Sequence, residues 1–330
     1  MKKIISIMLS MAMVLSLTAC SSSSTETSKE GSAADSKTTY KVGIVQLVQH
    51  EALDAATKGF RDALTEKLGD KVEFDEQNAS GDSATCATIS NQFVSSQYDL
   101  IMANATPALQ AAVSATNTIP ILGTSITDYA TALDIDNWNG VTGSNVSGTS
   151  DLAPLDQQAN MIKELFPNAK NIGILYCSAE ANSKYQSTTI TAYLKDMGYT
   201  CTEYTFADSN DVASVAQSAC QGSDVIYIPT DNTAASCAEA INNVTEPAGI
   251  PVIAGEEGIC KGCGIATLSI SYYDIGYSTG KMAYEILVNG ADVSKMDIQY
   301  APKVTYKYMA DRAANLGVTI PDNYEAITVE

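Results

Sequence analysis

Residue types that could carry out covalent chemistry are scarce in this 330-residue sequence, which has a single histidine, His50. One imidazole excludes histidine-rich zinc sites and any catalytic arrangement of two histidines. A Ser–His triad could use only His50, and GSNVSG at 143–148 lacks the spacing of a Gly-x-Ser-x-Gly nucleophile elbow. The loop that contains His50 reads VQHEALD, without the glycines of a dinucleotide site. We therefore predict no catalytic residue and no cofactor.

Cysteine is the other reactive residue type, and the first of eight, Cys20, closes an N-terminal signal. Lys2 and Lys3 precede an apolar run at 4–17, which ends in Leu-Thr-Ala-Cys. This order is typical of a secretory signal, and the run is shorter than the ~20 residues that span a bilayer. Its end resembles a bacterial lipobox, in which the cysteine receives lipid; an ordinary secretory signal is the alternative. We predict a signal peptide at 1–19, then a lipid-anchored flexible tether at 20–39 that holds the folded part outside the cell membrane.

The other seven cysteines include one close pair, Cys260 and Cys263, in a Cys-x-x-Cys sequence. A local disulfide or half of a four-cysteine metal site would explain this spacing, and an oxidising compartment is compatible with the disulfide. The sequence has no second Cys-x-x-Cys, so we predict no metal site. The others are interpreted as small or buried thiols: Cys86, Cys177, Cys201, Cys220 and Cys237.

Composition and charge limit the class of protein. With 45% hydrophobic and 17% charged residues, the chain is globular, and its length favours two domains. Thirty-eight acids against nineteen bases give a net charge of −19. This charge argues against nucleic acid or an acidic membrane surface as the main partner.

Short apolar runs rich in β-branched residues alternate with helical patterns from residue 40 onward. The predicted strands lie at 42–47, 72–76, 100–103, 119–123, 172–176, 200–206, 225–228 and 252–254. The predicted helices between them lie at 53–68, 83–94, 155–166 and 183–197. Such alternation predicts parallel sheets with helices on both faces. We therefore predict an α/β fold of two doubly wound parallel-sheet lobes joined by a hinge.

The last third of the chain is expected to cross between these lobes. It contains a predicted strand at 265–270, a long helix at 272–288, strands within 297–306 and a short helix at 309–316. Gly276 and Gly280 share one face of the long helix and predict close packing there. Crossings near 148–152, 259–266 and 301 divide the chain into a first lobe of 40–150 plus 266–300 and a second lobe of 151–265 plus 301–330. Closure of such lobes can bury a small molecule.

Small polar residues follow the predicted strands, at the edge where open parallel sheets bind ligands. Many of them could equally cap the next helix, although Glu256 is a poor N-cap by residue type. The residues that we predict to bind ligand are Gln49, His50, Asp54, Ala105, Thr106, Thr127, Asp128, Asp151, Asn182, Thr230, Asp231, Asn232 and Glu256.

The predicted site has two opposite polarities. Thr106-Pro107 has the pattern of a helix start, where free N–H groups attract a carboxylate. Glu256 or Asp231 from the second lobe would meet an ammonium. The pair of charges suits a zwitterion such as an amino acid, and second-lobe residues such as Asn182 should also matter for closure.

Motifs spread over residues 40–320 provide a separate line of evidence. They are GIVQ at 43–46, HEALDAATKGF at 50–60, NATPA at 104–108, NVSGTSD at 145–151, PTDNT at 229–233 and AGEEG at 254–258. Together they resemble a family of solute-binding lipoproteins of ABC importers. The resemblance implies the type I periplasmic-binding-protein fold, amino-acid ligands with tryptophan and tyrosine prominent, and delivery to a permease and its ATPase. Family members usually have Pro in place of Glu51, and polar residues in place of Cys260 and Cys263.

We therefore expect a monomeric binding protein that performs no catalysis. The alternatives are a ligand sensor that docks to a membrane receptor and, less favoured, an extracytoplasmic enzyme. A cytoplasmic repressor of the same fold would carry a helix-turn-helix where this chain has a signal.

Overall fold

The structure is a computed structural model that describes residues 39–328, all of them within one compact unit, Thr38–Glu330. The predicted signal peptide, the lipid site at Cys20 and all but the last residue of the predicted tether lie outside the described residues. Among residues 39–328, no helix is both long enough and apolar enough to span a bilayer.

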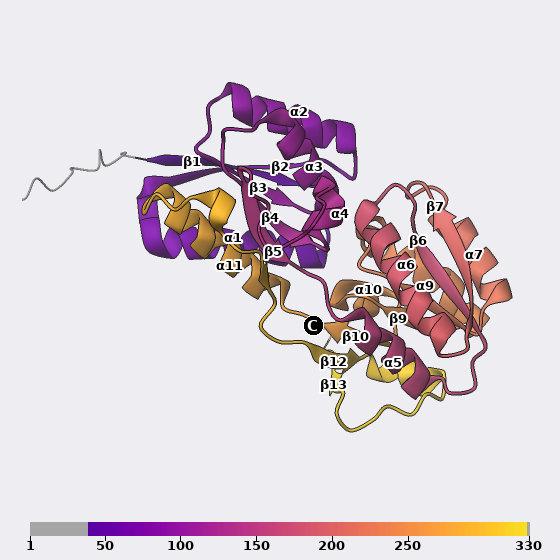
Figure 1. Cartoon of the computed structure of the whole chain (residues 1–330). Coiled ribbons are helices and arrows are strands. Elements are labelled where there is room, and N and C mark those ends of the chain that lie inside the picture. The colour runs from indigo at the N-terminus through magenta and orange to yellow at the C-terminus, as the bar shows by residue number, and fades with distance from the viewer. Residues whose placement is uncertain (1–38, 329–330) are drawn as a thin grey trace, which may run out of the picture. The chain divides into compact units, whose positions relative to one another are not determined.

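The first lobe is built on a six-stranded sheet with the order β11-β5-β4-β3-β1-β2 (Figure 1). All its pairings are parallel. Winding reverses between β2 and β3, on either side of β1, so the carboxyl ends of β1, β3 and β4 meet at one edge. The strands are β1 (Tyr40–Gln46), β2 (Val72–Asn78), β3 (Leu100–Asn104), β4 (Ile121–Ile126), β5 (Val146–Ser150) and β11 (Gln299–Tyr300).

The second lobe has a seven-stranded sheet with the order β13-β12-β10-β9-β8-β6-β7. Only the β10–β12 pairing is antiparallel in this sheet of the described chain. The predicted fold of two doubly wound, largely parallel lobes is confirmed. The strands are β6 (Asn171–Cys177), β7 (Thr200–Phe206), β8 (Val225–Ile228), β9 (Val252–Ala254), β10 (Ala266–Ser269), β12 (Thr305–Tyr308) and β13 (Glu325–Ala326).

Helices cover both faces of the first sheet because neighbouring strand residues bury their apolar side chains on opposite faces. Val45 packs in a cluster with Phe93 of α2 and Leu109 of α3, whereas Ile44 packs with Phe60 of α1 and Met282 of α11. Figure 1 shows these two helix pairs on opposite sides of the sheet. The helices are α1 (Glu51–Leu68), α2 (Ser83–Ser95), α3 (Thr106–Ala115), α4 (Tyr129–Leu133) and α11 (Tyr272–Leu287).

Glycines allow α1 and α11 to approach closely. A Cβ atom at Gly276 would lie 2.0 Å from the backbone oxygen of Ala56, and one at Gly280 would lie 2.6 Å from that of Phe60. Neither space admits a methyl group, so the predicted close packing at these glycines is confirmed.

The second sheet is covered in the same way. Leu175 and Ile226 pack in a cluster with residues of α7, α9 and α10, whereas Ile174 and Tyr227 pack with residues of α5 and α6. The helices are α5 (Leu155–Leu165), α6 (Ala181–Asp196), α7 (Val212–Gly222), α8 (Asn232–Ser236), α9 (Ala238–Ala248), α10 (Glu257–Gly262) and α12 (Ala310–Asn315).

The chain crosses between the sheets after β5, after β10 and after β11. One predicted boundary is wrong: the segment 266–300 begins too early for the first lobe, because β10 pairs with β9 and β12 of the second sheet. The crossing there falls at 270–271, just before α11. No strand is predicted from the sequence at β5, because its residues VSGTS include only one large apolar side chain.

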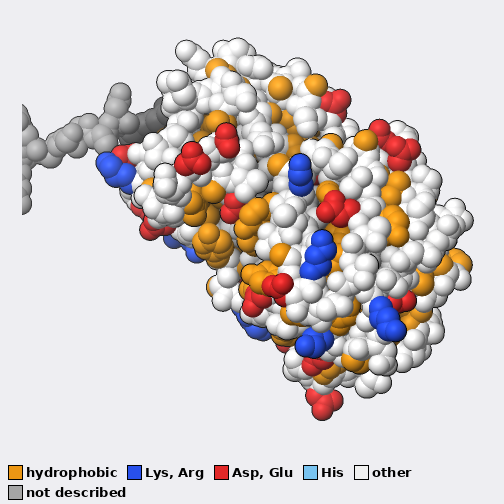
Figure 2. All heavy atoms as spheres, turned by 45° about the vertical axis from the view of Figure 1, so that its right-hand side comes forward, with side chains coloured by type: hydrophobic (Ala, Val, Ile, Leu, Met, Phe, Trp, Pro, Cys, Tyr) orange, Lys and Arg blue, Asp and Glu red, His pale blue; other side chains and the backbone are white. Residues whose placement is uncertain are grey.

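Charged side chains are dispersed over the face shown in Figure 2. Lys and Arg lie singly among acidic and uncharged groups there. On this face the charged groups form no single patch of one sign.

Candidate functional site

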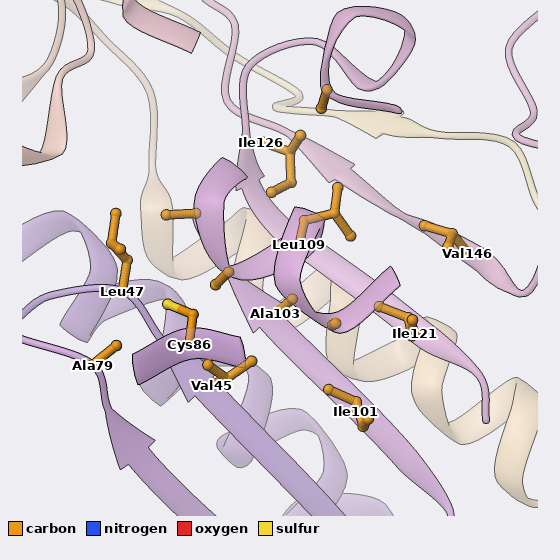
Figure 3. Close-up of a cluster of buried hydrophobic side chains, with 14 of the residues drawn as sticks. Val45, Leu47, Ala79, Cys86, Ile101, Ala103, Leu109, Ile121, Ile126 and Val146 are labelled. Atoms are coloured by element: carbon orange, nitrogen blue, oxygen red, sulfur yellow. The ribbon is translucent and has the colours of Figure 1, made fainter. Parts of the chain in front are cut away.

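The loops after β1, β3 and β4 of the first lobe lie side by side. Gln46 is in register with Asn104, and Asn104 with Thr124, so the three strands end together. Leu47 after β1, Ala103 on β3 and Ile126 on β4 belong to one buried cluster with Leu109 of α3 (Figure 3). This core fixes the loops, and the predicted residues His50, Ala105, Thr106 and Thr127 come together at the same edge.

Two of these loops contain residues with unfavourable backbone conformations. Ala105 has φ 91° and Ser125 has φ 56°, a region that favours glycine. Such a conformation costs roughly 1–3 kcal/mol and persists only where surrounding structure imposes it. Both residues are buried, which places the strained backbone at the strand ends that carry the predicted site.

The first lobe also has buried hydroxyls without partners. Among residues 39–328, neither Thr106 Oγ1 nor Ser125 Oγ has a hydrogen-bond partner. Thr106 is the first residue of α3, which has ten residues and Pro107 in its first turn. The free N–H groups of that turn add to the hydroxyls, and the helix dipole makes this edge suited to an anion.

Below these loops, three buried polar side chains form a network. Thr57 Oγ1 donates to Gln46 Oε1 at 2.6 Å, and Asn104 Nδ2 donates to Thr57 Oγ1 at 2.9 Å. Gln46 Nε2 donates to Asp54 Oδ1 at 2.7 Å. Asp54 is itself exposed, and its contact is to the supporting network of the first lobe.

His50 links the lobes. Its Nε2 lies 3.4 Å from Oδ1 of Asn232 in the second lobe, whereas Nδ1 is buried with no partner in the described part of the chain. Burial lowers the pKa of His50, against the opposing effects of its hydrogen bond to Asn232 and of nearby carboxylates, Glu180 first. The ring is therefore neutral at pH 7.

A buried carboxylate, Glu180, organises the loops of the second lobe. It accepts hydrogen bonds from Asn182 Nδ2 at 3.0 Å, from Asn232 N and Nδ2 at 3.1 and 2.6 Å, and from Thr233 N and Oγ1 at 2.9 and 2.8 Å. These donors lie in the first turns of α6 and α8, the helices that follow the neighbouring strands β6 and β8. Glu180 therefore joins two predicted site residues, Asn182 and Asn232, although it is not itself among the predicted ones.

Gln186 of α6 makes the second direct link between the lobes. Its Nε2 donates to Thr127 Oγ1 of the first lobe and to Thr230 O, both at 3.2 Å, and its Oε1 accepts from Thr230 N at 3.1 Å. Asn182 Nδ2 also donates to Thr230 O, at 3.1 Å. Gln186 therefore lies with three predicted residues around its hydrogen bond to the first lobe. These residues are Thr127, Asn182 and Thr230.

Asp231 and Glu256, predicted to meet an ammonium, are both helix caps. Asp231 Oδ1 accepts from Ala234 N at 2.7 Å and Oδ2 from Cys177 N at 2.6 Å. Glu256 accepts from the backbone N–H groups of Gly258 and Ile259, so the expectation that it is a poor N-cap is wrong. Its longer side chain folds back onto the first turn of α10. Burial raises the pKa of Asp231 to about 8 and that of Glu256 to about 7, against these hydrogen bonds.

Three predicted residues remain to be placed: Asp151, Asp128 and Gln49. Asp151, at the first crossing, accepts from Thr127 Oγ1 at 3.2 Å and from Tyr272 Oη at 2.9 Å, and burial raises its pKa to about 6. Asp128 caps α4 through Thr131 N at 2.7 Å and is half-buried. Gln49 is exposed beside His50.

A groove of about 430 Å³ opens between the two sets of loops. First-lobe residues Val48 and Pro107 line it, as do second-lobe residues Glu180 and Thr233. On the side of the crossing strands, Lys261 of α10 donates to Glu51 at the start of α1. Ion pairing and hydrogen bonding thus hold the lobes against each other.

The cysteines of the described chain have no disulfide partner. All seven within residues 39–328 are free, so the disulfide considered for Cys260 and Cys263 is not formed. Both thiols are buried, and burial raises the pKa of Cys263 to about 12, which keeps it unreactive. No cluster of three or more His, Cys, Asp or Glu side chains in the described chain is arranged to hold a metal ion.

Sequence reasoning missed Glu180, Gln186 and Ser125. Glu180 lies in a loop that the strand pattern identifies, but its five donors come from the first turns of two helices, α6 and α8, that only the fold brings together. Gln186 lies inside a helix, and the unusual backbone of Ser125 arises from the irregular β4–β5 pairing between Gly123 and Ile126.

Comparisons with known proteins agree with this geometry. A family model described as ABC transporter substrate binding protein matches residues 41–329. A curated "Tyrosine-binding protein" of Clostridioides difficile (strain R20291) is 39% identical over 291 residues, which cover 87% of this chain and 84% of that protein.

Two solved structures bear on the arrangement of the lobes. A Streptococcus pneumonia protein in complex with L-Trp has 33% identity and a TM-score of 0.84, and the match covers 88% of this chain and 100% of that one. The ligand-free, open structure of a Clostridium difficile substrate-binding protein with adhesive properties has 36% identity and a TM-score of only 0.67, with 88% and 100% coverage. The overall structure of this chain is therefore more similar to the L-Trp complex than to the ligand-free, open structure.

The two wound lobes with facing polar loops define a binding protein of the type I periplasmic class. More specifically, the chain belongs to the family of ABC transporter substrate-binding proteins. That family consists of binding proteins and is not an enzyme family.

Proposed function

We propose that this protein is the extracytoplasmic binding lipoprotein of an ABC importer and holds one free aromatic amino acid between its lobes. The tyrosine-binding relative and the L-Trp complex support an aromatic ligand, because each matches more than four-fifths of this chain. Lipid on Cys20 is the proposed anchor, and a permease with its ATPase are the proposed partners of a monomer.

The observation that carries the proposal is the set of unpaired, buried polar atoms at the strand ends of both lobes. Thr106 Oγ1 and Ser125 Oγ in the first lobe, and Asn182 Oδ1 in the second, lack a partner within residues 39–328. Each such atom costs roughly 1–3 kcal/mol while it stays unpaired. A ligand with both donors and acceptors would offset these costs.

The charges of the site support a zwitterion. The start of α3 in the first lobe suits a carboxylate. Asp151, Glu180, Asp231 and Glu256 are buried, and none forms an ion pair with Lys or Arg among the described residues. Buried carboxylates without a cation are unfavourable, so this region favours a ligand that brings an ammonium.

Closure couples the ligand to transport in this proposal. Thr127 with Gln186, and His50 with Asn232, bond across the lobes and would separate on opening. A ligand that contacts both lobes shifts the equilibrium toward the closed form by its differential affinity. The permease would then recognise the closed protein.

The test is calorimetry and thermal melting of the full chain in detergent with each of the twenty amino acids. We expect tyrosine, tryptophan or phenylalanine to bind, and a ligand at one hundred times its Kd to stabilise the protein by ~2.7 kcal/mol. Thr106→Val should weaken that binding about fivefold, since one hydrogen bond of ~1 kcal/mol is lost.

The matched control is Thr131→Val, because Thr131 is exposed on α4 of the same lobe. It should leave affinity unchanged. Absence of any aromatic ligand among those that bind would exclude the proposed ligand class. Equal effects of the two valine variants would remove Thr106 from the site.

A further inference from the structure

The carboxylate of Glu180 fixes the orientation of Asn182. Asn182 Nδ2 lies 3.0 Å from Glu180 Oε2 and 3.1 Å from Thr230 O, and both of these oxygens only accept hydrogen bonds. The amide cannot be rotated by 180° without setting its oxygen against theirs. Oδ1 must therefore point away from Glu180, and it is buried with no partner in the described residues.

The same carboxylate fixes Asn232 and, through it, the tautomer of His50. Asn232 Nδ2 donates to Glu180 Oε2 at 2.6 Å, so Oδ1 is the atom that faces His50 Nε2. An amide oxygen only accepts, so Nε2 must carry the proton. In the neutral ring Nδ1 is then a bare acceptor, and it too is buried without a partner among residues 39–328.

We propose that Glu180 is a positioning residue that holds Asn182 Oδ1 and His50 Nδ1 as two acceptors for the ammonium of the ligand. This inference rests on the proposed function, because it assigns the recognition of one end of that ligand. It differs from the sequence-based assignment, in which Glu256 or Asp231 binds the ammonium directly.

The environment of the two acceptors favours a cation over a neutral donor. Glu180 lies within 3.0 Å of Asn182 Nδ2 and forms no ion pair with Lys or Arg in the described chain. Glu51 and Asp54 also act on His50 from its own helix, and Lys261 of α10 is bonded to Glu51. The three carboxylates of Glu180, Glu51 and Asp54 outnumber the one lysine, so the surroundings of His50 and Asn182 carry a net negative charge.

Protonation of His50 reverses the polarity of one acceptor. The second proton goes to Nδ1, which then donates and carries positive charge toward the ammonium. Because burial lowers the pKa of His50, and the carboxylates of Glu180, Asp54 and Glu51 oppose this, the neutral ring predominates above pH 6.5. Affinity should be constant above that pH and decrease below it, by at most about tenfold per unit.

The experiment compares the amino acid that binds with its own analogue lacking the ammonium; for tyrosine this is 3-(4-hydroxyphenyl)propionate. In calorimetry at pH 7.5, we expect Glu180→Gln to weaken the amino acid about tenfold or more, and the analogue less than threefold. The control is Glu203→Gln on β7, whose carboxyl accepts from Tyr176 Oη at 2.8 Å in the same lobe. It should change neither affinity.

Loss of both affinities to the same extent would indicate a merely structural role and overturn the inference, as would no loss at all. Phenylalanine, which lacks the tyrosine hydroxyl, provides a further check. If the effect of Glu180→Gln on affinity depends on that hydroxyl and not on the ammonium, the inference is also overturned. If Glu180→Gln does not fold, His50→Gln provides the second test, because it keeps a donor toward Asn232 but removes Nδ1. The His50→Gln variant should bind the amino acid more weakly than the wild type, with an affinity that does not change between pH 5.5 and 8. If the variant keeps the pH profile of the wild type, the inference is overturned.

If the protein binds only an amino acid that is not aromatic, the proposed function is contradicted. The comparison of that amino acid with its analogue lacking the ammonium, in the wild type and in Glu180→Gln, is still valid. The experiments therefore distinguish a wrong ligand class from a wrong role for Glu180.

Discussion

The loops at the strand ends of the two lobes are built in different ways. In the first lobe, Ala105 and Ser125 hold positive φ angles, and Thr106 and Ser125 keep unpaired hydroxyls. In the second lobe, Glu180 and Asp231 accept hydrogen bonds from several loop N–H groups and side chains. The first lobe therefore keeps unpaired hydroxyls that a ligand can satisfy, whereas the carboxyl groups of the second lobe hold their own loops in place before any ligand arrives.

Polar residues that follow strands look alike in the sequence, but they have different roles in the two lobes. Polar residues after strands of the first lobe are available to a ligand, and acids after strands of the second lobe first hold their own loops together. Preorganised groups bind with less loss of conformational entropy. The second lobe should thus define where the ligand sits, and the first should gain most from its presence.

The largest expected effect comes from removing a framework carboxylate. Asp231→Ala loses the cap of α8 and leaves the Cys177 N–H without its acceptor. A lost cap costs ~1 kcal/mol and a buried unpaired donor ~1–3, so unfolding by urea should show a loss of about 2–4 kcal/mol. Asp128→Ala, which removes the half-buried cap of α4 in the first lobe, should cost only ~1 kcal/mol.

Similar losses for the two alanine variants would contradict the idea that the second-lobe acids carry more of the framework. Ligand affinity adds a second readout, since Asp231→Ala should weaken binding through its disordered loop.

The next effect is a dependence of stability on pH. Burial raises the folded-state pKa of Glu256 to about 7 and of Asp231 to about 8, above the values of unfolded carboxyls. The folded state therefore binds more protons than the unfolded state, and stability is lost as pH rises through 7 and 8. Between pH 6.5 and 8.5, which lies above the titration of His50, the empty protein should lose on the order of 1–3 kcal/mol.

Thermal melts across this range measure the slope, and Glu256→Gln and Asp231→Asn should each flatten it. A stability that rises with pH in this window would contradict the assignment of buried, cation-free carboxylates to the second lobe.

The sequence predicts the framework better than the site. Alternating apolar runs identify most strands because each lobe buries its sheet on both faces, whereas β5 escapes notice because its residues are small. His50, Thr106 and Asn182 can be selected because they follow such strands. The role of Glu180 depends on donors from the first turns of two helices, and the capping by Glu256 depends on a side-chain conformation, so neither follows from residue order.

The smallest effect concerns the strained backbone of the first lobe. Ala105 has φ 91° and ψ 155°, a conformation that glycine adopts readily and alanine does not. Ala105→Gly relieves this strain but loses a buried methyl group and gains entropy when unfolded. Since the strain is worth roughly 1–3 kcal/mol and the two losses about 1 kcal/mol together, the variant should be more stable by about 1 kcal/mol.

The matched control is Ala108→Gly, three residues along in the helical part of α3, where the same change removes the same methyl group without relieving strain. It should lower the free energy of unfolding by ~1 kcal/mol, opposite in sign to Ala105→Gly. The strained loop is the one that presents Thr106, so a relaxed backbone should also weaken ligand binding about twofold through lost preorganisation. Equal destabilisation by both glycine variants would mean that the first lobe stores no strain at Ala105, and the contrast between the lobes would then rest on the backbone of Ser125 and on the unpaired hydroxyls.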